Sequence, residues 1–154
     1  MRTFAIVAMG GTFDIIHKGH IALLEKAFSI SSHVIIGLTS DEMAKRRGKK
    51  LFHTYEQRFN ALSDLLKETF PGNTYVISKL DDDFGPAVVE GDVEALVVSD
   101  ETAYQGQVLN RMRAERGLGP VQVVIVPLVL ASDGKRISST RIRNSEIDAE
   151  GNMR

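Results

Sequence analysis

Short apolar segments alternate with amphipathic ones along the whole chain, and this alternation restricts the fold more than any other feature of the sequence. The apolar segments are rich in Val and Ile, and each is bounded by Gly, Ser, Asp or Pro. They cover residues 3–9, 33–39, 74–78, 94–98 and 121–127. Continuous apolar runs of this length are typical of strands that are buried on both faces, as in a parallel sheet.

The segments between these runs have the spacing of amphipathic helices, with apolar side chains three or four residues apart. They cover residues 19–30, 55–69 and 101–116. Thr54 and Gln57 have the spacing of a capping box, and Gly117 follows the last segment as a C-terminal cap. We therefore expect a single α/β domain over residues 1–154, built on a doubly wound, Rossmann-like sheet of five parallel strands. In such sheets ligands bind beyond the carboxyl ends of the strands.

Composition narrows the class of protein. The 43% hydrophobic content is ordinary for a soluble globular domain, and the formal net charge of -1 disfavours nucleic acid or an anionic membrane as the main partner. The absence of cysteine excludes disulfides, thiolate nucleophiles and cysteine-ligated zinc, and it suits a reducing compartment. The first apolar run is too short for a signal peptide or a membrane span, so we expect a cytoplasmic protein, with a flexible polar tail over 147–154.

The first loop, "GGTFDIIHKGH" at residues 10–20, follows the first strand and opens the first helix. Gly10 and Gly11 are expected to let the backbone turn and approach a ligand closely. A helix N-terminus attracts anions, and His17 and His20 fall on the same side of its first turn. The pattern predicts a phosphate site, and the alternative is a capped turn with surface histidines. No carboxylate stands at the spacing of a zinc-binding helix.

A second hydroxyl-rich and basic segment follows the last strand, over residues 135–143. Its three hydroxyl side chains precede basic residues, and its members are Ser138, Ser139, Thr140, Arg141 and Arg143. Hydroxyls and N–H groups at a helix start, with arginine nearby, predict a second polyphosphate site. An N-capped helix with solvated arginines is the alternative.

Two charged runs follow the second and third strands and belong to the same edge of the sheet. The basic run "AKRRGKK" at 44–50 is either a solvated loop, a nucleic-acid patch or a phosphate site. The acidic residues Asp81 to Asp83 either border a ligand pocket or form a solvated turn, and we favour the turn.

The first loop and the hydroxyl-rich segment together resemble the paired signature, HxGH and ISSTxxR, of the cytidylyltransferase-type nucleotidyltransferase superfamily. Within it the sequence is most similar to phosphopantetheine adenylyltransferases of the archaeal and eukaryotic type, through "KKLFHTYEQR" at 49–58 and "VVSDETAYQGQVLNRMR" at 97–113. The bacterial enzymes usually carry Thr in place of His17, and Arg-Gly in place of Ser99 and Asp100. The resemblance implies a nucleotidyltransferase fold in which another residue replaces the bacterial phosphate-binding arginine.

The resemblance also implies a reaction, in which AMP passes from ATP to 4′-phosphopantetheine and gives dephospho-coenzyme A and pyrophosphate in coenzyme A biosynthesis. Thr12 and His20 would contact the α-phosphate, and Lys49, with Lys50 or Lys45 as substitutes, would hold the acceptor phosphate. The implied catalytic and ATP-binding residues are Gly11, Thr12, Phe13, His17, Lys18, His20, Ser138, Ser139, Thr140 and Arg141. Gly11 and Phe13 would act through their main chain. Mg²⁺ would accompany ATP through phosphate oxygens and water, with no metal site built from side chains.

Two other functions stay open at the level of sequence. One is a different adenylyltransferase of the same superfamily, either a nicotinamide mononucleotide adenylyltransferase or an FAD synthetase. The other is a non-catalytic nucleotide- or nucleic-acid-binding domain that uses the basic run at 44–50. No segment indicates an oligomer interface, and a monomer is expected.

Overall fold

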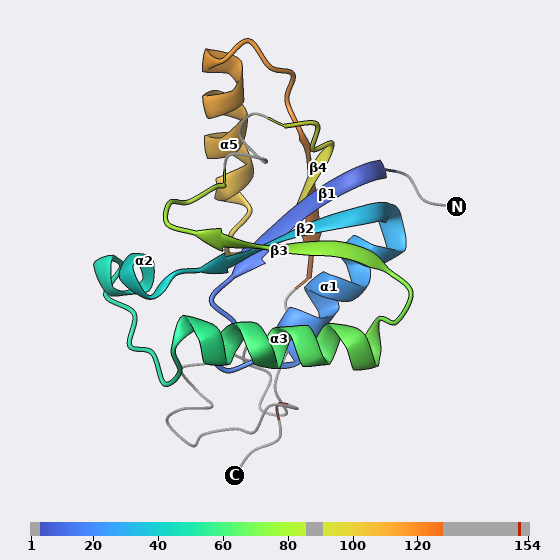
Figure 1. The fold of residues 1–154 in the computed structure, drawn as a ribbon. Coiled ribbons are helices and arrows are strands. Elements are labelled where there is room, and N and C mark those ends of the chain that lie inside the picture. The colour runs from blue at the N-terminus through green and yellow to red at the C-terminus, as the bar shows by residue number, and fades with distance from the viewer. Residues whose placement is uncertain (1–3, 86–90, 128–150, 152–154) are drawn as a thin grey trace.

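The computed structural model describes residues 4–85, 91–127 and 151 of the chain. Its centre is a sheet of five parallel strands in the order β3-β2-β1-β4-β5 (Figure 1). The strands are β1 (Phe4–Gly11), β2 (Ser31–Thr39), β3 (Thr74–Leu80), β4 (Ala95–Ser99) and β5 (Gln122–Val126). All five predicted strands are confirmed, with ends that shift by one or two residues. β1 lies in the middle, so the chain winds to one side for β2 and β3 and to the other for β4 and β5.

Helices cover both faces of the sheet. Three of them, α1 (Lys18–Ile30), α3 (Tyr55–Thr69) and α5 (Tyr104–Glu115), lie where the apolar periodicity predicted them. α1 and α3 lie on one side of the sheet and α5 on the other (Figure 1). Leu24 of α1 and Leu62 of α3 are fully buried in one core cluster, and Leu109 of α5 is fully buried in the other. The sheet is therefore doubly wound, as expected.

The caps predicted for these helices are present. The Thr54 hydroxyl accepts a hydrogen bond from the Gln57 N–H at 3.2 Å, and the Gln57 side chain accepts one from the Thr54 N–H at 3.0 Å. Gly117 follows α5 with a φ of 72°, the left-handed conformation that favours glycine at this position.

A short helix, α2 (Asp41–Arg46), occupies the first part of the basic run, where the sequence pattern predicted no helix. Its N-cap is Ser40, whose hydroxyl accepts a hydrogen bond from the Met43 N–H at 3.0 Å. Acidic residues stand in its first turn and basic residues in its last, which matches the helix dipole. This helix was not predicted because six residues are too few to show a helical period.

The sharp turn after β1 does not fall on the glycines. Gly10 and Gly11 are the last residues of the strand, and the positive φ of 52° belongs to Phe13. Gly10 is closely packed instead, because a Cβ there would lie 3.2 Å from the Gly37 carbonyl oxygen on β2, which is tighter than most Cβ contacts. A Cβ at Gly37 would in turn lie 2.6 Å from Leu80 Cδ1. The prediction of a glycine turn was wrong, while close approach to a ligand stays a prediction.

Among the residues that the structure describes, no helix combines the length and the apolar character that crossing a membrane would require.

Candidate functional site

The two histidines of the first loop form the N-terminal cap of α1. His17 is the N-cap residue, and its Nδ1 accepts a hydrogen bond from the Gly19 N–H at 3.0 Å. His20 Nδ1 accepts one from the His17 N–H at 3.1 Å. The two rings are stacked, with centroids 3.9 Å apart. A capping box usually joins Ser or Thr to Glu or Gln, and here two imidazoles make both bonds. The cap of the alternative interpretation is therefore confirmed, but its surface histidines are not, because both rings are partly buried.

This cap determines the hydrogen-bonding capacity of His20. Because Nδ1 accepts a main-chain hydrogen bond, a neutral ring carries its proton on Nε2. Burial, followed by the nearby charges of His17 and Lys49, holds the pKa of His20 well below its ordinary value of about 6.5. At neutral pH His20 is thus an uncharged donor through Nε2–H. A positioned donor of this kind can stabilise negative charge that develops on a phosphate.

Lys49 meets the first loop from the segment that follows α2. Its Nζ donates a hydrogen bond to Thr12 Oγ1 at 3.0 Å, and it lies close enough to His20 to lower the pKa of that ring. Thr12, His20 and Lys49 therefore gather at the carboxyl end of β1, as the sequence predicted. The neighbouring Lys18 and Lys50 are exposed. Phe13 is 2% exposed and packs in the core, so its main chain is the part that a nucleotide could contact.

A cavity of about 150 Å³ opens at the same edge of the sheet. Gly10, Gly11 and Gly37 line it at the ends of β1 and β2, and Thr12 and Lys49 also border it. Much of the remaining lining is apolar, and it comes from Ile35 of β2, Leu80 of β3, Val98 of β4 and Phe84 of the loop after β3. The cavity is thus lined by the ammonium-bearing Lys49 and the hydroxyl-bearing Thr12 together with apolar side chains.

The acidic turn after β3 contacts the end of α2. Arg47 pairs with Asp83, both of which line the cavity, and the Arg46 side chain donates to the Asp81 carbonyl. Asp81, Asp82 and Asp83 are exposed, so the solvated-turn prediction is confirmed, although Asp83 also borders the cavity. Of the two arginines in the basic run, Arg47 is therefore paired with a carboxylate, and Arg46 contacts a main-chain carbonyl.

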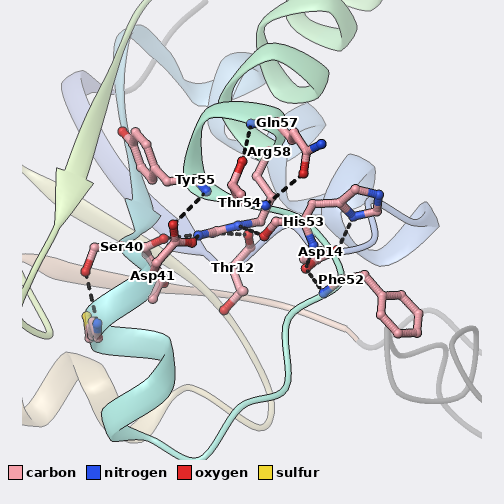
Figure 2. A network of polar contacts seen from close by, with 12 residues as sticks. Thr12, Asp14, Ser40, Asp41, Phe52, His53, Thr54, Tyr55, Gln57 and Arg58 are labelled. Carbon is pink, nitrogen blue, oxygen red and sulfur yellow. Dashed lines mark hydrogen bonds and ion pairs between the residues drawn. The ribbon is translucent and has the colours of Figure 1, made fainter.

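A buried arginine that sequence reasoning assigned no role lies behind the first loop. Arg58 of α3 is 1% exposed, and its guanidinium donates to the carbonyls of Thr12 at 3.0 Å, Thr39 at 2.7 Å and His53 at 3.3 Å. It also donates to the Asp41 carboxylate at 2.8 Å (Figure 2). Its place inside "KKLFHTYEQR" was the available signal, but its partners lie up to 46 residues away in sequence.

Asp14 makes a second link between the first loop and the segment before α3. Its carboxylate is fully buried and accepts hydrogen bonds from the N–H groups of Phe52 and His53 at 2.8 and 3.0 Å (Figure 2). Its other oxygen lies 2.7 Å from His53 Nδ1. The loop residue Asp14 thereby holds the 52–53 backbone, although sequence reasoning gave it no function.

The Arg58–Asp41 pair predicts how stability depends on pH. Burial opposes ionisation of Asp41, but the hydrogen bond from Arg58, a main-chain bond from Tyr55 and nearby positive charge lower its pKa below the ordinary value. Its contribution is therefore full above about pH 4 and is lost as the pH falls through the lowered pKa. We expect Asp41→Asn to reduce the free energy of unfolding by about 1 kcal/mol at pH 7, since Asp41 is half exposed, and by much less at pH 2. Urea unfolding at both pH values would check this, and an equal loss at the two would contradict it.

The hydroxyl-rich segment lies outside the described residues. This applies to Ser138, Ser139, Thr140 and Arg141, so their proposed contacts with polyphosphate stay predictions. In the 97–113 segment, Ser99 and Thr102 form a local turn in which the Thr102 hydroxyl accepts from the Ser99 N–H at 3.0 Å. Thr102 and Gln105 border the cavity from this side.

Comparison with known proteins places this fold and site in a class. The model of the cytidylyltransferase-like family matches residues 8–145, and the chain belongs to that family. Curated relatives carry a more particular name. A phosphopantetheine adenylyltransferase from Methanosarcina barkeri is 44% identical over 151 residues, which cover 96% of this chain and 92% of that protein.

A bifunctional phosphopantetheine adenylyltransferase/NTP phosphatase from Thermoplasma volcanium is also 44% identical, over 147 residues. The match covers 95% of this chain but 44% of that longer protein. Among solved structures, a protein of unknown function from Archaeoglobus fulgidus superposes with a TM-score of 0.71 at 29% identity, covering 79% of this chain and 88% of that chain.

Proposed function

We propose that this chain transfers the adenylyl group of ATP to 4′-phosphopantetheine, giving dephospho-coenzyme A and pyrophosphate in coenzyme A biosynthesis. The names of its curated relatives support the assignment. The structural observation that carries it is the meeting of Thr12, His20 and Lys49 beside a cavity with apolar walls. A phosphate joined to a flexible arm of methylene and amide groups suits this lining, in which apolar and polar side chains are mixed.

The proposed reaction needs no general base. The acceptor phosphate has a second pKa near 6, so it is mostly dianionic at pH 7. One of its oxygens forms a bond to the α-phosphorus of ATP. The bond from that phosphorus to the oxygen bridging to the β-phosphate breaks, and pyrophosphate leaves with the electron pair. The protein contributes positioning and charge stabilisation to this in-line displacement.

The residues divide this work by their chemistry. Lys49 Nζ, a compact cation, holds the acceptor phosphate, and the neutral His20 donates its Nε2–H to the α-phosphate. We assign Thr12 to the α-phosphate as well, and its hydroxyl already accepts a hydrogen bond from Lys49. We assign His17, Lys18 and the main chain of Gly11 and Phe13 to the nucleotide. The β- and γ-phosphates are assigned to Ser138, Ser139, Thr140 and Arg141.

The donors gathered here suit phosphate oxygens rather than a metal ion. Thr12, His20 and Lys49 offer hydroxyl, imidazole and ammonium groups, whereas Mg²⁺ prefers carboxylate, phosphate and water oxygens. No cluster of three or more His, Asp or Glu side chains suited to a metal occurs within the described ranges. Mg²⁺ therefore belongs to the proposal as a partner of the ATP phosphates, where it supplies neutralisation of their charge.

A nucleic-acid-binding role for the basic run has less support. Arg47 is paired with Asp83, and Arg46 donates to a main-chain carbonyl, so these two side chains are already engaged. A nucleic-acid binder releases counterions and loses affinity steeply as salt rises.

We propose a monomeric cytoplasmic enzyme. The cytoplasmic location is supported by the absence of cysteine, which suits a reducing compartment.

A substrate comparison tests the function directly. Pyrophosphate release is measured with ATP, Mg²⁺ and one of four acceptors, namely 4′-phosphopantetheine, unphosphorylated pantetheine, nicotinamide mononucleotide or FMN. We expect turnover with 4′-phosphopantetheine, none with pantetheine, and ATP formation when dephospho-coenzyme A and pyrophosphate are supplied. Faster turnover of nicotinamide mononucleotide or FMN would overturn the acceptor assignment in favour of another adenylyltransferase.

A further inference from the structure

Stability alone does not explain why an arginine, rather than an apolar residue, is buried at position 58. Arg58 is the largest of the fully buried side chains among the described residues. Taking a guanidinium out of water is costly, and well-packed apolar residues often replace a buried ion pair without loss of stability. The four partners of Arg58 come from different segments, which are the loop after β1, the end of β2, the start of α2 and the residue before the α3 cap. The guanidinium therefore links four segments of the chain by hydrogen bonds.

The hydrogen bonds of Arg58 also connect the two segments that carry Thr12 and Lys49, the side chains proposed to contact the substrate phosphates. Arg58 Nη1 holds the main-chain carbonyl of Thr12, whose hydroxyl accepts the hydrogen bond from Lys49. Lys49 lies on the segment that ends at His53, and Arg58 Nε holds the carbonyl of His53. The guanidinium therefore holds the main chain of the first loop at Thr12 and the main chain at His53, on the segment that carries Lys49 (Figure 2).

Arg58 itself lies behind the site. The described residues that line the cavity include Thr12 and Lys49 but not Arg58. Its contacts are with main-chain carbonyls and with Asp41, so it acts on the site through the backbone that carries Thr12 and Lys49. This geometry separates positioning from substrate binding.

We propose that Arg58 is a positioning residue for the transfer step, which sets the separation between the acceptor phosphate on Lys49 and the α-phosphate beside Thr12 and His20. The inference rests on the function proposed above. Each substrate keeps its own binding groups without Arg58, but the two reacting atoms are no longer held at a single separation. Misplacement by about 1 Å can lower a rate about 100-fold. Loss of Arg58 therefore acts on kcat more than on either KM.

The test compares Arg58→Lys with Arg113→Lys. Arg113 is also buried, at 6% exposure, and its guanidinium also donates to main-chain carbonyls, those of Gly119 and Gly91, on the α5 side of the sheet. The two variants make the same chemical change in two buried guanidiniums. We expect Arg58→Lys to lower kcat by about 10- to 100-fold with less than a threefold change in either KM, and Arg113→Lys to leave kcat within about twofold. Both variants should lower the melting temperature.

Three results would overturn the proposal: kcat of Arg58→Lys within twofold of the parent, equal kcat losses in the two variants, or a loss that appears in KM alone. Should Arg58→Lys fail to fold, Asp41→Asn serves instead, because it leaves Arg58 in place and removes the charge that orients its Nη2. The expected fall in kcat is then about threefold or more at unchanged ATP affinity by calorimetry, and an unchanged kcat overturns the idea. Absence of turnover in the parent protein would instead refute the proposed function.

Discussion

His20→Ala is expected to lower turnover by roughly 10²–10³-fold, the usual effect of removing one donor that stabilises charge in the transition state. The neutral ring donates through Nε2, and no described neighbour in the cap offers the same group in its place: His17 is held as N-cap, and Lys49 is assigned to the acceptor. Binding of ATP should change far less, because many other groups contact the nucleotide. Steady-state kinetics and calorimetry with ATP check the two parts separately.

The structure adds a complication, since His20 also caps α1. Loss of its Nδ1 removes a capping hydrogen bond, which is worth about 1 kcal/mol of stability. His20→Gln separates the two roles, because glutamine is a common capping-box partner whose amide oxygen can accept the His17 N–H. We expect His20→Gln to keep most of the stability and to lose nearly as much turnover as His20→Ala. A fall of less than about fivefold in both variants would show that His20 does not act on the reacting phosphate.

Lys49→Ala is expected to raise the KM for 4′-phosphopantetheine by about 10- to 100-fold, the equivalent of a hydrogen bond to a charged group, about 1.5–3 kcal/mol. ATP affinity should stay within about twofold, because the triphosphate is assigned to other groups. The expected loss is large because a dianionic phosphate needs a compact cation, which the Thr12 hydroxyl cannot replace.

Two further variants sharpen this test. Lys67→Ala removes an exposed lysine from the last turn of α3 and should leave both constants unchanged. Lys50→Ala examines the neighbour that the sequence left as a substitute. If Lys50→Ala raised the acceptor KM and Lys49→Ala did not, the acceptor phosphate would belong to Lys50, and the contact between Lys49 and Thr12 would be structural.

The sequence predicted the features that depend on local pattern. Strands and long helices were found because apolar periodicity reports burial directly, and the Thr54–Gln57 cap was found because its bonds span three residues. The meeting of Thr12, His20 and Lys49 was also predicted, because carboxyl ends of parallel strands share an edge. What these side chains bind stays a prediction.

Two kinds of feature were missed. Some depend on contacts between segments that are far apart in the sequence, and one is a helix too short to show a period. α2 has too few residues to show a period. The turn at Phe13 was assigned to the glycines, because the sequence does not show that Gly10 faces a carbonyl of β2. Arg58 and Asp14 looked like ordinary charged residues, and their burial follows from partners about 40 residues away.

In the sheet, the strands on one side of β1 come from the earlier part of the sequence and those on the other side from the later part. Strands β1, β2 and β3 pair side by side within the first 80 residues, whereas β1 meets β4 through pairs such as Val7 with Ala95. The hydrogen bonds of Arg58 described above, and the contact of Lys49 with Thr12, join residues between Thr12 and Arg58. The side chains proposed to hold the acceptor therefore come from one contiguous stretch, which is synthesised before β4 and β5. The hydroxyl-rich segment proposed to bind the leaving pyrophosphate is translated after β5.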